Sequence, residues 1–272
     1  MTDLQQRVEQ LLASHEPTTT GPADFLGAQF DAGLAWVHFP EGRGGLSLAR
    51  GRQLEVDALL EAARAPRPDV ARNSIGLGMA APTLLAYGSE ELQQRHLRSL
   101  FACTEIWCQL FSEPGAGSDL AAVATRAVPD GDEWVIDGQK VWTSGAHGAD
   151  FAILLARTDT SVPKHAGMTY FVVDMTDPGI EVRPLRQITG EAEFNEVFLA
   201  GVRVHDGNRV GAVGQGWTVA TTTLNNERVA IGAGTHPAQA GQGRPARPRH
   251  ARPAPQRPRA AGGPPRELTE RA

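Results

Sequence analysis

A glycine-rich segment, residues 112–119 (Ser-Glu-Pro-Gly-Ala-Gly-Ser-Asp), has the residue types of a loop that binds a ligand. It follows a short extended run and contains a rigid proline, two glycines and the Ser118 hydroxyl. Glycines such as Gly117 let the backbone come close to a ligand, and successive N–H groups with a hydroxyl can hold phosphate or carbonyl oxygens. A plain surface turn explains the composition equally well, so both interpretations stay open.

Two pairs of an aromatic ring and a hydroxyl accompany this segment. Trp142 precedes Thr143 and Ser144 on a predicted strand, and Phe111 precedes Ser112 on another. A flat ring beside hydroxyls could pack against a planar heterocycle and hydrogen-bond its polar edge. A single tryptophan on a strand is more often a core residue. Two such pairs beside a glycine-rich turn nevertheless favour a flat cofactor with a polar edge.

An acid and a base, Glu227 and Arg228, follow each other on the last predicted helix. Adjacent residues on a helix point in directions about 100° apart, so a single solvent-facing stripe does not explain both residues. A carboxylate in an apolar pocket could remove a proton next to a carbonyl, while the arginine fixes an anionic group. A solvated pair is the alternative, and it is the one that the sequence alone prefers.

The run Gly76-Leu-Gly-Met-Ala-Ala81 spells a dinucleotide-binding fingerprint, but that motif works only where a strand leads into the glycine turn. Residues 67–73 are no buried strand, so we expect small residues that let a helix pack closely. Neither the two cysteines, Cys103 and Cys108, nor the histidines have the spacing of a metal site, and we expect no metal. We expect free thiols in a reducing cytoplasm.

The first hundred residues have helical periodicity, which predicts an N-terminal helical domain over residues 1–105. Helices are predicted over 75–87 and over 90–100, the latter with Ser89 as its N-cap, and Pro66 and Pro68 should stop an earlier helix. The apolar residues that repeat at helical spacing in the first two helical runs are Leu4, Val8, Leu11 and Leu12, then Leu54, Ala58, Leu59 and Ala62.

Short extended runs predict a β domain over residues 106–210. They cover 107–112, 133–136, 140–144, 151–157, 169–174, 180–183 and 196–199. Asp137-Gly138, between two of these runs, is a strong signal for a tight hairpin. Strands without intervening helices favour a barrel or a sandwich over a parallel sheet. From Gly216 the helical period returns, with Trp217, Ala220, Leu224 and Ile231, and predicts a helix within residues 211–234.

The composition is that of an ordinary globular chain of 272 residues, 41% of them hydrophobic. No window approaches eighteen apolar residues and the N-terminus lacks the pattern of a signal peptide, so membrane spanning and secretion are not expected. The net charge of −5 combines −11 over residues 1–234 with +6 over residues 235–272. The second stretch holds eight of the nineteen prolines, and we expect it to be disordered.

A basic tail could be an arm that binds nucleic acid, with residues 244–249 (Arg-Pro-Ala-Arg-Pro-Arg) on phosphates. It has no aromatic residue for base stacking. Arg, Pro, Ala and Gly all have GC-rich codons, so a shifted reading frame in a GC-rich gene would write the same composition. We favour the shifted frame and expect no nucleic-acid or membrane partner.

Three segments together resemble the FAD-dependent acyl-CoA dehydrogenase family: residues 109–119 (Gln-Leu-Phe-Ser-Glu-Pro-Gly-Ala-Gly-Ser-Asp), 137–144 (Asp-Gly-Gln-Lys-Val-Trp-Thr-Ser) and 224–228 (Leu-Asn-Asn-Glu-Arg). The likeness covers approximately residues 1–234. It implies an α+β multidomain protein with an N-terminal helical domain, a middle β-barrel domain and the start of a truncated C-terminal helical bundle, with FAD between barrel and bundle. The residues implied to line the flavin are Phe111, Ser112, Gly117, Ser118, Trp142 and Ser144, and those near the acyl-CoA are Ser118 and Arg228.

The resemblance also implies a reaction. A glutamate removes the α-proton of the acyl-CoA while the β-hydrogen leaves as hydride to the flavin, and an electron-transfer flavoprotein reoxidises the cofactor. In some members the base occupies the position of Glu227; in many it lies in the C-terminal bundle. The tail from residue 235 does not resemble the family, so we expect a truncated chain with impaired activity, from a parent that is a homo-oligomer. A related flavin oxidase or monooxygenase, and a non-catalytic acyl-CoA or flavin-binding remnant, are the alternatives.

Overall fold

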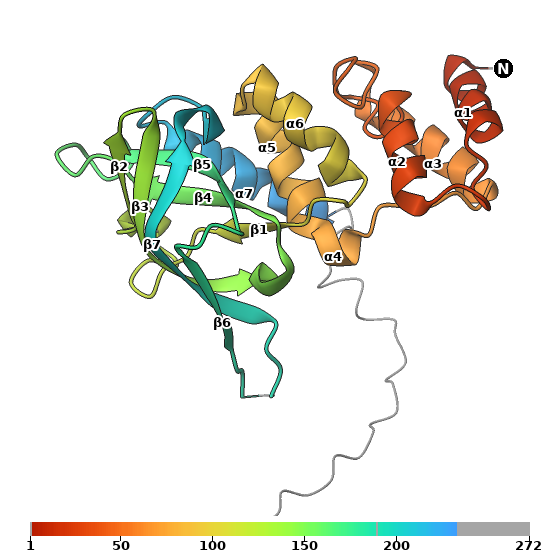
Figure 1. Cartoon of the computed structure of the whole chain (residues 1–272). Helices are drawn as coiled ribbons and strands as arrows, with labels where there is room; N and C mark the ends of the chain where they lie inside the picture. The colour runs from red at the N-terminus through yellow and green to blue at the C-terminus, as the bar shows by residue number, and fades with distance from the viewer. Residues whose placement is uncertain (1, 189, 233–272) are drawn as a thin grey trace, which may run out of the picture. The chain divides into compact units, whose positions relative to one another are not determined.

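The computed structural model describes residues 2–188 and 190–232, so the predicted tail, residues 235–272, lies outside the described residues. Helices and strands follow in the expected order of helix, strand and helix (Figure 1). The α-helices are α1 (Asp3–Ser14), α2 (Pro22–Asp31), α3 (Gln53–Ala62), α4 (Val70–Ile75), α5 (Ala81–Tyr87), α6 (Glu90–Phe101) and α7 (Gly216–Gly232).

Helix α6 begins where the sequence predicts, because the Ser89 side chain accepts a hydrogen bond from the N–H of Leu92. The buried face of α1 includes Leu4, Val8 and Leu11, as their spacing indicates. In α3 the periodicity misleads. Leu54 is 74% exposed, whereas Val56 and Leu60, four residues apart, face the core. Apolar residues occupy two faces of this helix, and packing selects one of them.

The predicted helix over residues 75–87 is interrupted. Asn73 in α4 departs from helical geometry, and residues Gly76–Ala80 form a π-helical segment, η2, before α5 begins. Asn73 is fully buried: its Nδ2 donates to the carbonyls of Leu100 and Glu105, and its Oδ1 accepts the N–H of Trp107. No strand precedes Gly76, since α4 does, and this confirms that the fingerprint-like run is a helical packing segment.

Eight strands form one sheet, paired in the order β6-β7-β3-β2-β4-β5-β8, with β1 parallel to β4. Their bounds are β1 (Trp107–Leu110), β2 (Arg126–Asp130), β3 (Glu133–Ser144), β4 (Phe151–Arg157), β5 (Met168–Asp174), β6 (Ile180–Leu185), β7 (Phe194–His205) and β8 (Arg209–Val210). The sequence missed β2 and β8 and predicted β7 too short. Residues from β1 to β5 and β7 share one buried cluster, so the sheet curls around an interior in the manner of a barrel.

The predicted hairpin at Asp137-Gly138 is wrong. Strand β3 runs through these residues without a turn, and the two-residue hairpin loop is Gly131-Asp132, between β2 and β3. Asp137 Oδ1 instead accepts the N–H of Gly201 at 2.8 Å. Gly138 serves a close approach of two segments, because a Cβ there would lie 2.3 Å from Thr125 Oγ1.

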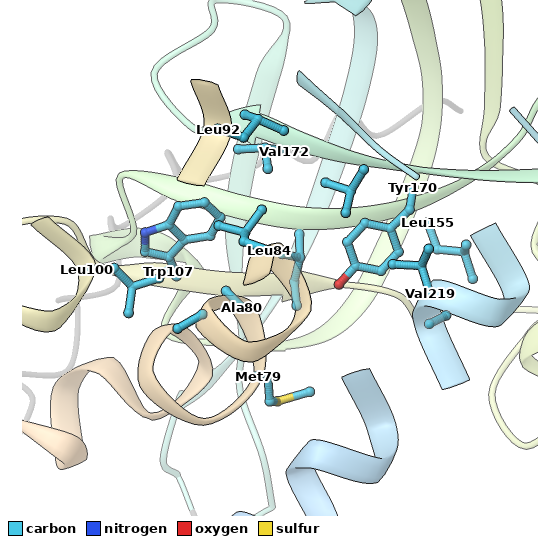
Figure 2. Packing of buried hydrophobic residues seen from close by; sticks show 14 of the residues in the cluster. Met79, Ala80, Leu84, Leu92, Leu100, Trp107, Leu155, Tyr170, Val172 and Val219 are labelled. Carbon is cyan, nitrogen blue, oxygen red and sulfur yellow. The ribbon is translucent and has the colours of Figure 1, made fainter. Parts of the chain in front are cut away.

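The middle strands are buried on both faces. Along β4, Ile153 and Leu155 pack against the helices, while Ala152, Leu154 and Ala156 belong to the interior of the curled sheet. This explains the continuous apolar run that predicted the strand. Figure 2 shows the core between the helices and the sheet, where side chains of η2, α5 and α6 meet the sheet and α7. The labelled residues are Met79, Ala80, Leu84, Leu92, Leu100, Trp107, Leu155, Tyr170, Val172 and Val219.

Hydroxyl groups fasten α7 to this core. Thr223 Oγ1 lies 2.9 Å from Thr83 Oγ1 on α5 and 3.1 Å from the Tyr170 hydroxyl on β5, and all three residues are buried. Tyr87 reaches Thr222 in the same way at 3.1 Å. The hydrogen bonds fix the rotation of α7 about its axis, since a turned helix would leave these groups buried without partners.

Over residues 2–188 and 190–232, no helix is long and apolar enough to cross a membrane, and no group of acidic, histidine or cysteine side chains could hold a metal ion. Cys108 is buried and Cys103 half-buried, and both are free thiols as expected.

Candidate functional site

A buried ion pair lies beneath the glycine-rich segment. The Nζ of Lys140, on β3, is 2.7 Å from Glu113 Oε1, and the Lys140 side chain is completely buried. The same Nζ donates to the carbonyls of Phe111 at 3.1 Å and Leu155 at 2.8 Å. Its three N–H groups therefore reach three acceptors on two segments of chain, residues 111–113 and β4.

The Glu113 carboxylate also binds the chain that follows the glycine-rich segment. Its two oxygens accept the N–H groups of Ala124 at 2.6 Å and Thr125 at 3.0 Å. Burial acts to raise the pKa of Glu113, but the charge of Lys140 and these hydrogen bonds outweigh it, so the pKa lies below its usual value. The carboxylate is thus ionised and fully engaged beneath the turn.

The two predicted halves of the ligand site meet at one hydrogen bond. The N–H of Val141 donates to the carbonyl of Ser112 at 2.8 Å. Ser112 follows Phe111, and Val141 precedes Trp142, so both ring-and-hydroxyl pairs lie at this junction. The structure therefore places the backbone of Ser112 directly beside that of Val141, next to Trp142 in the chain.

Trp142 occupies a β-bulge in β3. Lys140 pairs with Val197 and Thr143 with Asn195, so two residues of β3 oppose one of β7. Trp142 has a left-handed φ of 60°, which is a rare conformation for a bulky side chain. The indole is 60% exposed and contacts Phe194 edge-on, with ring centroids 5.8 Å apart.

The bulge has a direct consequence for the direction of the indole. Trp134, Ile136 and Lys140 are buried and alternate along β3, and Trp142 has the same parity. A regular strand would therefore direct Trp142 inward beside Lys140. The extra residue reverses the alternation and places the indole at the surface. Strain of this kind persists where the surrounding structure enforces it, and it is common at ligand sites.

The turn itself is exposed above its buried anchor. Glu113 and Ala116 exchange two backbone hydrogen bonds of 3.0 Å, which closes a tight turn at Pro114-Gly115. Gly117 and Ser118 are exposed, and nothing lies within 4 Å of where a Gly117 side chain would begin. Within the described chain, the side-chain hydroxyls of Ser112, Ser118 and Ser144 form no hydrogen bond. Free hydroxyls at Ser112 and Ser118 and open backbone at Gly117 thus lie on the anchored turn, and the Ser144 hydroxyl lies at the end of β3.

Phe111 takes a different place from that of the other predicted residues. Its side chain is 4% exposed and contacts Tyr170 edge-on, with centroids 5.7 Å apart. The ring is part of the core between sheet and helices, so it has little surface to offer a ligand. The backbone carbonyl of Phe111 matters more, because it accepts a hydrogen bond from Lys140.

The acid and the base of α7 separate in space as helical geometry requires. Glu227 is half-buried and lies four residues after Thr223, on the face that packs against α5 and β5. Arg228 is exposed, and its Nη1 donates to Asn225 Oδ1 of the same helix at 3.2 Å. Arg228 is therefore a solvated residue of the helix surface, and the role of Glu227 stays a prediction. In the described part of the chain, no side-chain hydrogen bond or ion pair joins either residue to the turn or to Trp142.

The sequence analysis missed Glu113 and Lys140 as a functional pair. One signal was available, because Lys140 continues the inward alternation of Trp134 and Ile136 and thus should point into the β domain. A lysine directed inward requires an acidic partner. Nothing in the spacing identifies Glu113 as that partner, since the two residues are 27 positions apart.

A cavity of about 480 Å³ lies elsewhere, among α1, α2 and Arg98 of α6. It contains none of the predicted site residues. Arg98 is already paired with Asp31 at 2.9 Å on an exposed surface. The chemistry predicted from the sequence therefore belongs to the β domain and α7 and not to this cavity.

Comparison with known proteins agrees with the expected family. Residues 108–202 match the family model of the acyl-CoA dehydrogenase middle domain. The chain is 53% identical over 207 residues to the acyl-CoA dehydrogenase FadE34 of Mycobacterium tuberculosis, an alignment that covers 75% of this chain and 28% of that protein. It is 49% identical over 197 residues to the acyl-CoA dehydrogenase IpdE1 of the same organism, covering 72% and 50%.

The fold is similar to that of solved structures. The Tcur3481–Tcur3483 steroid ACAD has a TM-score of 0.62 and 30% sequence identity, over 85% of this chain and 61% of that one. The chain thus spans less than two thirds of the length of each of these three proteins.

Proposed function

Because the chain belongs to the acyl-CoA dehydrogenase family, we propose that it takes part in the flavin-dependent conversion of an acyl-CoA thioester to the trans-2-enoyl-CoA. The observation that carries the proposal is the strained, exposed Trp142 beside an anchored turn with free hydroxyls. The activity is a proposal because the chain spans only part of its relatives.

The residues present fit FAD as the cofactor. The exposed indole of Trp142 offers a flat surface for the ring system, and the hydroxyls of Ser112, Ser118 and Ser144 can donate to its polar edges. The open backbone at Gly117 allows close approach of an anionic or carbonyl group. Phe111 would support this surface from the core, and Ser118 would also contact the acyl-CoA.

The proposed reaction removes two hydrogens from adjacent carbons. Glu227 accepts the proton from Cα, and the electron pair of that C–H bond forms the second bond between Cα and Cβ. FAD, when bound, supplies the acceptor for the hydride that leaves Cβ. Arg228 would fix an anionic part of the substrate at the surface of α7. Substrate binding would have to replace the hydrogen bond between Arg228 and Asn225.

The direct test is anaerobic mixing of FAD-loaded protein with acyl-CoA thioesters. Loss of the yellow flavin absorbance together with formation of enoyl-CoA supports the proposal. A bound flavin that no acyl-CoA bleaches would instead indicate a non-catalytic binding protein. Steroid-derived and other bulky acyl-CoA thioesters are the first substrates to test, because a relative of similar fold is a steroid ACAD.

The proposed electron acceptor is an electron-transfer flavoprotein, which takes up the electrons of the reduced cofactor. A flavin oxidase or monooxygenase is the alternative within the same fold. Hydrogen peroxide or an oxygenated product in the presence of air would exclude the simple dehydrogenase. The impaired activity expected from the tail concerns residues outside the described part and stays a prediction, as does assembly into a homo-oligomer.

A further inference from the structure

The ion pair between Lys140 and Glu113 is buried, and both of its residues lie close in the chain to exposed parts of the candidate site. Lys140 is two residues before Trp142, and Glu113 directly follows Ser112. Nζ joins β3 to the carbonyls of Phe111 on the turn and Leu155 on β4. Glu113 joins the same point to the N–H groups of Ala124 and Thr125, in the segment that follows the turn.

We propose that Lys140 and Glu113 are positioning residues whose buried ion pair holds the Ser112–Asp119 turn in register with the bulge at Trp142, so that both can contact one flat cofactor. The inference rests on the proposed function and deepens it. Neither side chain reaches the surface, since Lys140 is fully buried and Glu113 is 7% exposed. They act on the site through the backbone of Ser112 and Val141, which are joined by a 2.8 Å hydrogen bond.

A purely structural explanation does not account for the choice of charged groups. A buried ion pair is rarely more stabilising than well-packed apolar side chains of similar volume, because both charges lose their hydration. An apolar pair could fill this space but could not hold the two carbonyls and the two N–H groups that the ion pair binds. The ion pair adds hydrogen bonds of fixed direction. Such bonds are needed to hold a turn and a bulge in the positions from which both can contact one ligand.

The ion pair between Lys140 and Glu113 shares no hydrogen bond with the buried cation Arg157. Glu113 is the acidic partner of Lys140 and the charged group that contacts its Nζ. Arg157, on β4, is a second buried cation, but it donates to the backbone carbonyls of Ala121, Val123 and Lys164 and not to Glu113. Arg157 thus fixes the segment that follows the turn by separate hydrogen bonds and does not compete for Glu113.

The test uses the double variant Lys140→Met/Glu113→Gln in the full chain, because either single change leaves one buried charge unpaired and destabilises the fold. The double variant keeps the volume and removes both charges. The matched control is Arg203→Met/Glu133→Gln, which removes an exposed ion pair of the same length, 2.7 Å, at the opposite end of β3. FAD affinity is measured by fluorescence titration, and backbone order by hydrogen exchange.

We expect the double variant to bind FAD roughly ten- to a hundredfold more weakly than the parent, the range found when groups that support the ligands of a metal site are removed. The amides of Ala124, Thr125 and Val141 should exchange faster, while those of α1 keep their rates. The control should match the parent in both measurements. Parent-like FAD affinity in a double variant that folds would overturn the inference.

The two proposals can fail separately. If the parent chain binds no FAD at all, the proposed flavin site fails in this chain, and hydrogen exchange alone decides the role of the ion pair. Faster exchange confined to Ala124, Thr125 and Val141 then supports positioning by the pair. Unchanged exchange at these amides, or equal acceleration throughout the fold, overturns it.

Discussion

The two ends of the proposed site, the turn at residues 112–119 and the end of α7, are held in very different ways. The turn is anchored by buried hydrogen bonds to Glu113 and Lys140, with distances of 2.6–3.1 Å. Glu227 is carried by α7 and lies one turn after Thr223, whose hydroxyl contacts Thr83 and Tyr170 in the core. The turn therefore has buried hydrogen bonds at one of its own residues, Glu113, whereas Glu227 is positioned only through the helix that carries it.

The largest effect is expected from Glu227→Gln, which keeps size and hydrogen bonding but removes the base. Loss of a general base should slow reduction of the flavin by acyl-CoA about 10²- to 10⁴-fold, measured by stopped-flow absorbance. FAD affinity should not change, because the change leaves the turn and Trp142 untouched. Reduction at the parent's rate would show that the base lies elsewhere and that Glu227 is structural.

Thr223→Val tests whether α7 is placed by its hydroxyl contacts. The variant leaves Tyr170 and Thr83 without their shared partner, so the free energy of unfolding should fall by about 1–3 kcal/mol in urea denaturation. Thr221→Val is the control, because Thr221 is exposed and its hydroxyl donates only within the helix. The control should change stability by less than about 0.5 kcal/mol. Equal losses in both variants would refute the anchoring role of Thr223.

The pH dependence separates positioning from stability. Burial lowers the pKa of Lys140 to about 8, and above that pH the neutral amine has two N–H donors for three acceptors. FAD affinity should therefore fall as pH rises through 8, by up to about tenfold between pH 7 and 9 if binding requires the ammonium form. The Lys140→Met/Glu113→Gln variant should show no such inflection.

The effect of Lys140 on stability has the opposite sign. The unfolded chain keeps the proton up to the ordinary pKa of 10.5, so between about 8 and 10.5 the unfolded state binds more protons than the folded state. The contribution of this group to the free energy of unfolding therefore rises with pH in that window. A fall in FAD affinity that merely follows a fall in stability would contradict the positioning role.

The smallest effect concerns strain at Trp142. Trp142→Gly should be about 0.5–1 kcal/mol more stable than Trp142→Ala without ligand, because glycine relieves the left-handed φ and this outweighs its greater freedom in the unfolded chain. Both variants should bind FAD more weakly than the parent. Thr143 does not have a positive φ, so there the alanine variant should be more stable than the glycine variant. Equal stability of the two Trp142 variants would mean that the bulge stores no strain.

Local signals predicted most of the elements. The run over residues 151–157 was predicted with its bounds because a strand buried on both faces is continuously apolar, and Ser89 marked the start of α6 because a cap acts within four residues. The same kind of reasoning failed at Asp137-Gly138. An Asp-Gly pair suits both a tight turn and a close approach of strands, and only Thr125, which is far away in sequence, decides between them.

The sequence by itself determined the order of helix, strand and helix, the glycine-rich turn and the two ring-and-hydroxyl pairs, because each depends on residues close together in the chain. Tertiary structure alone decided which way those residues face. Lys140 and Glu113 pair across 27 positions, and the bulge against β7 turns Trp142 outward although its parity points inward. The rotation of α7, which sets the direction of Glu227, is fixed where Thr223 finds partners on α5 and β5. Long-range packing sets these directions, since a bulge or a helix rotation depends on the partner segment and leaves no local pattern.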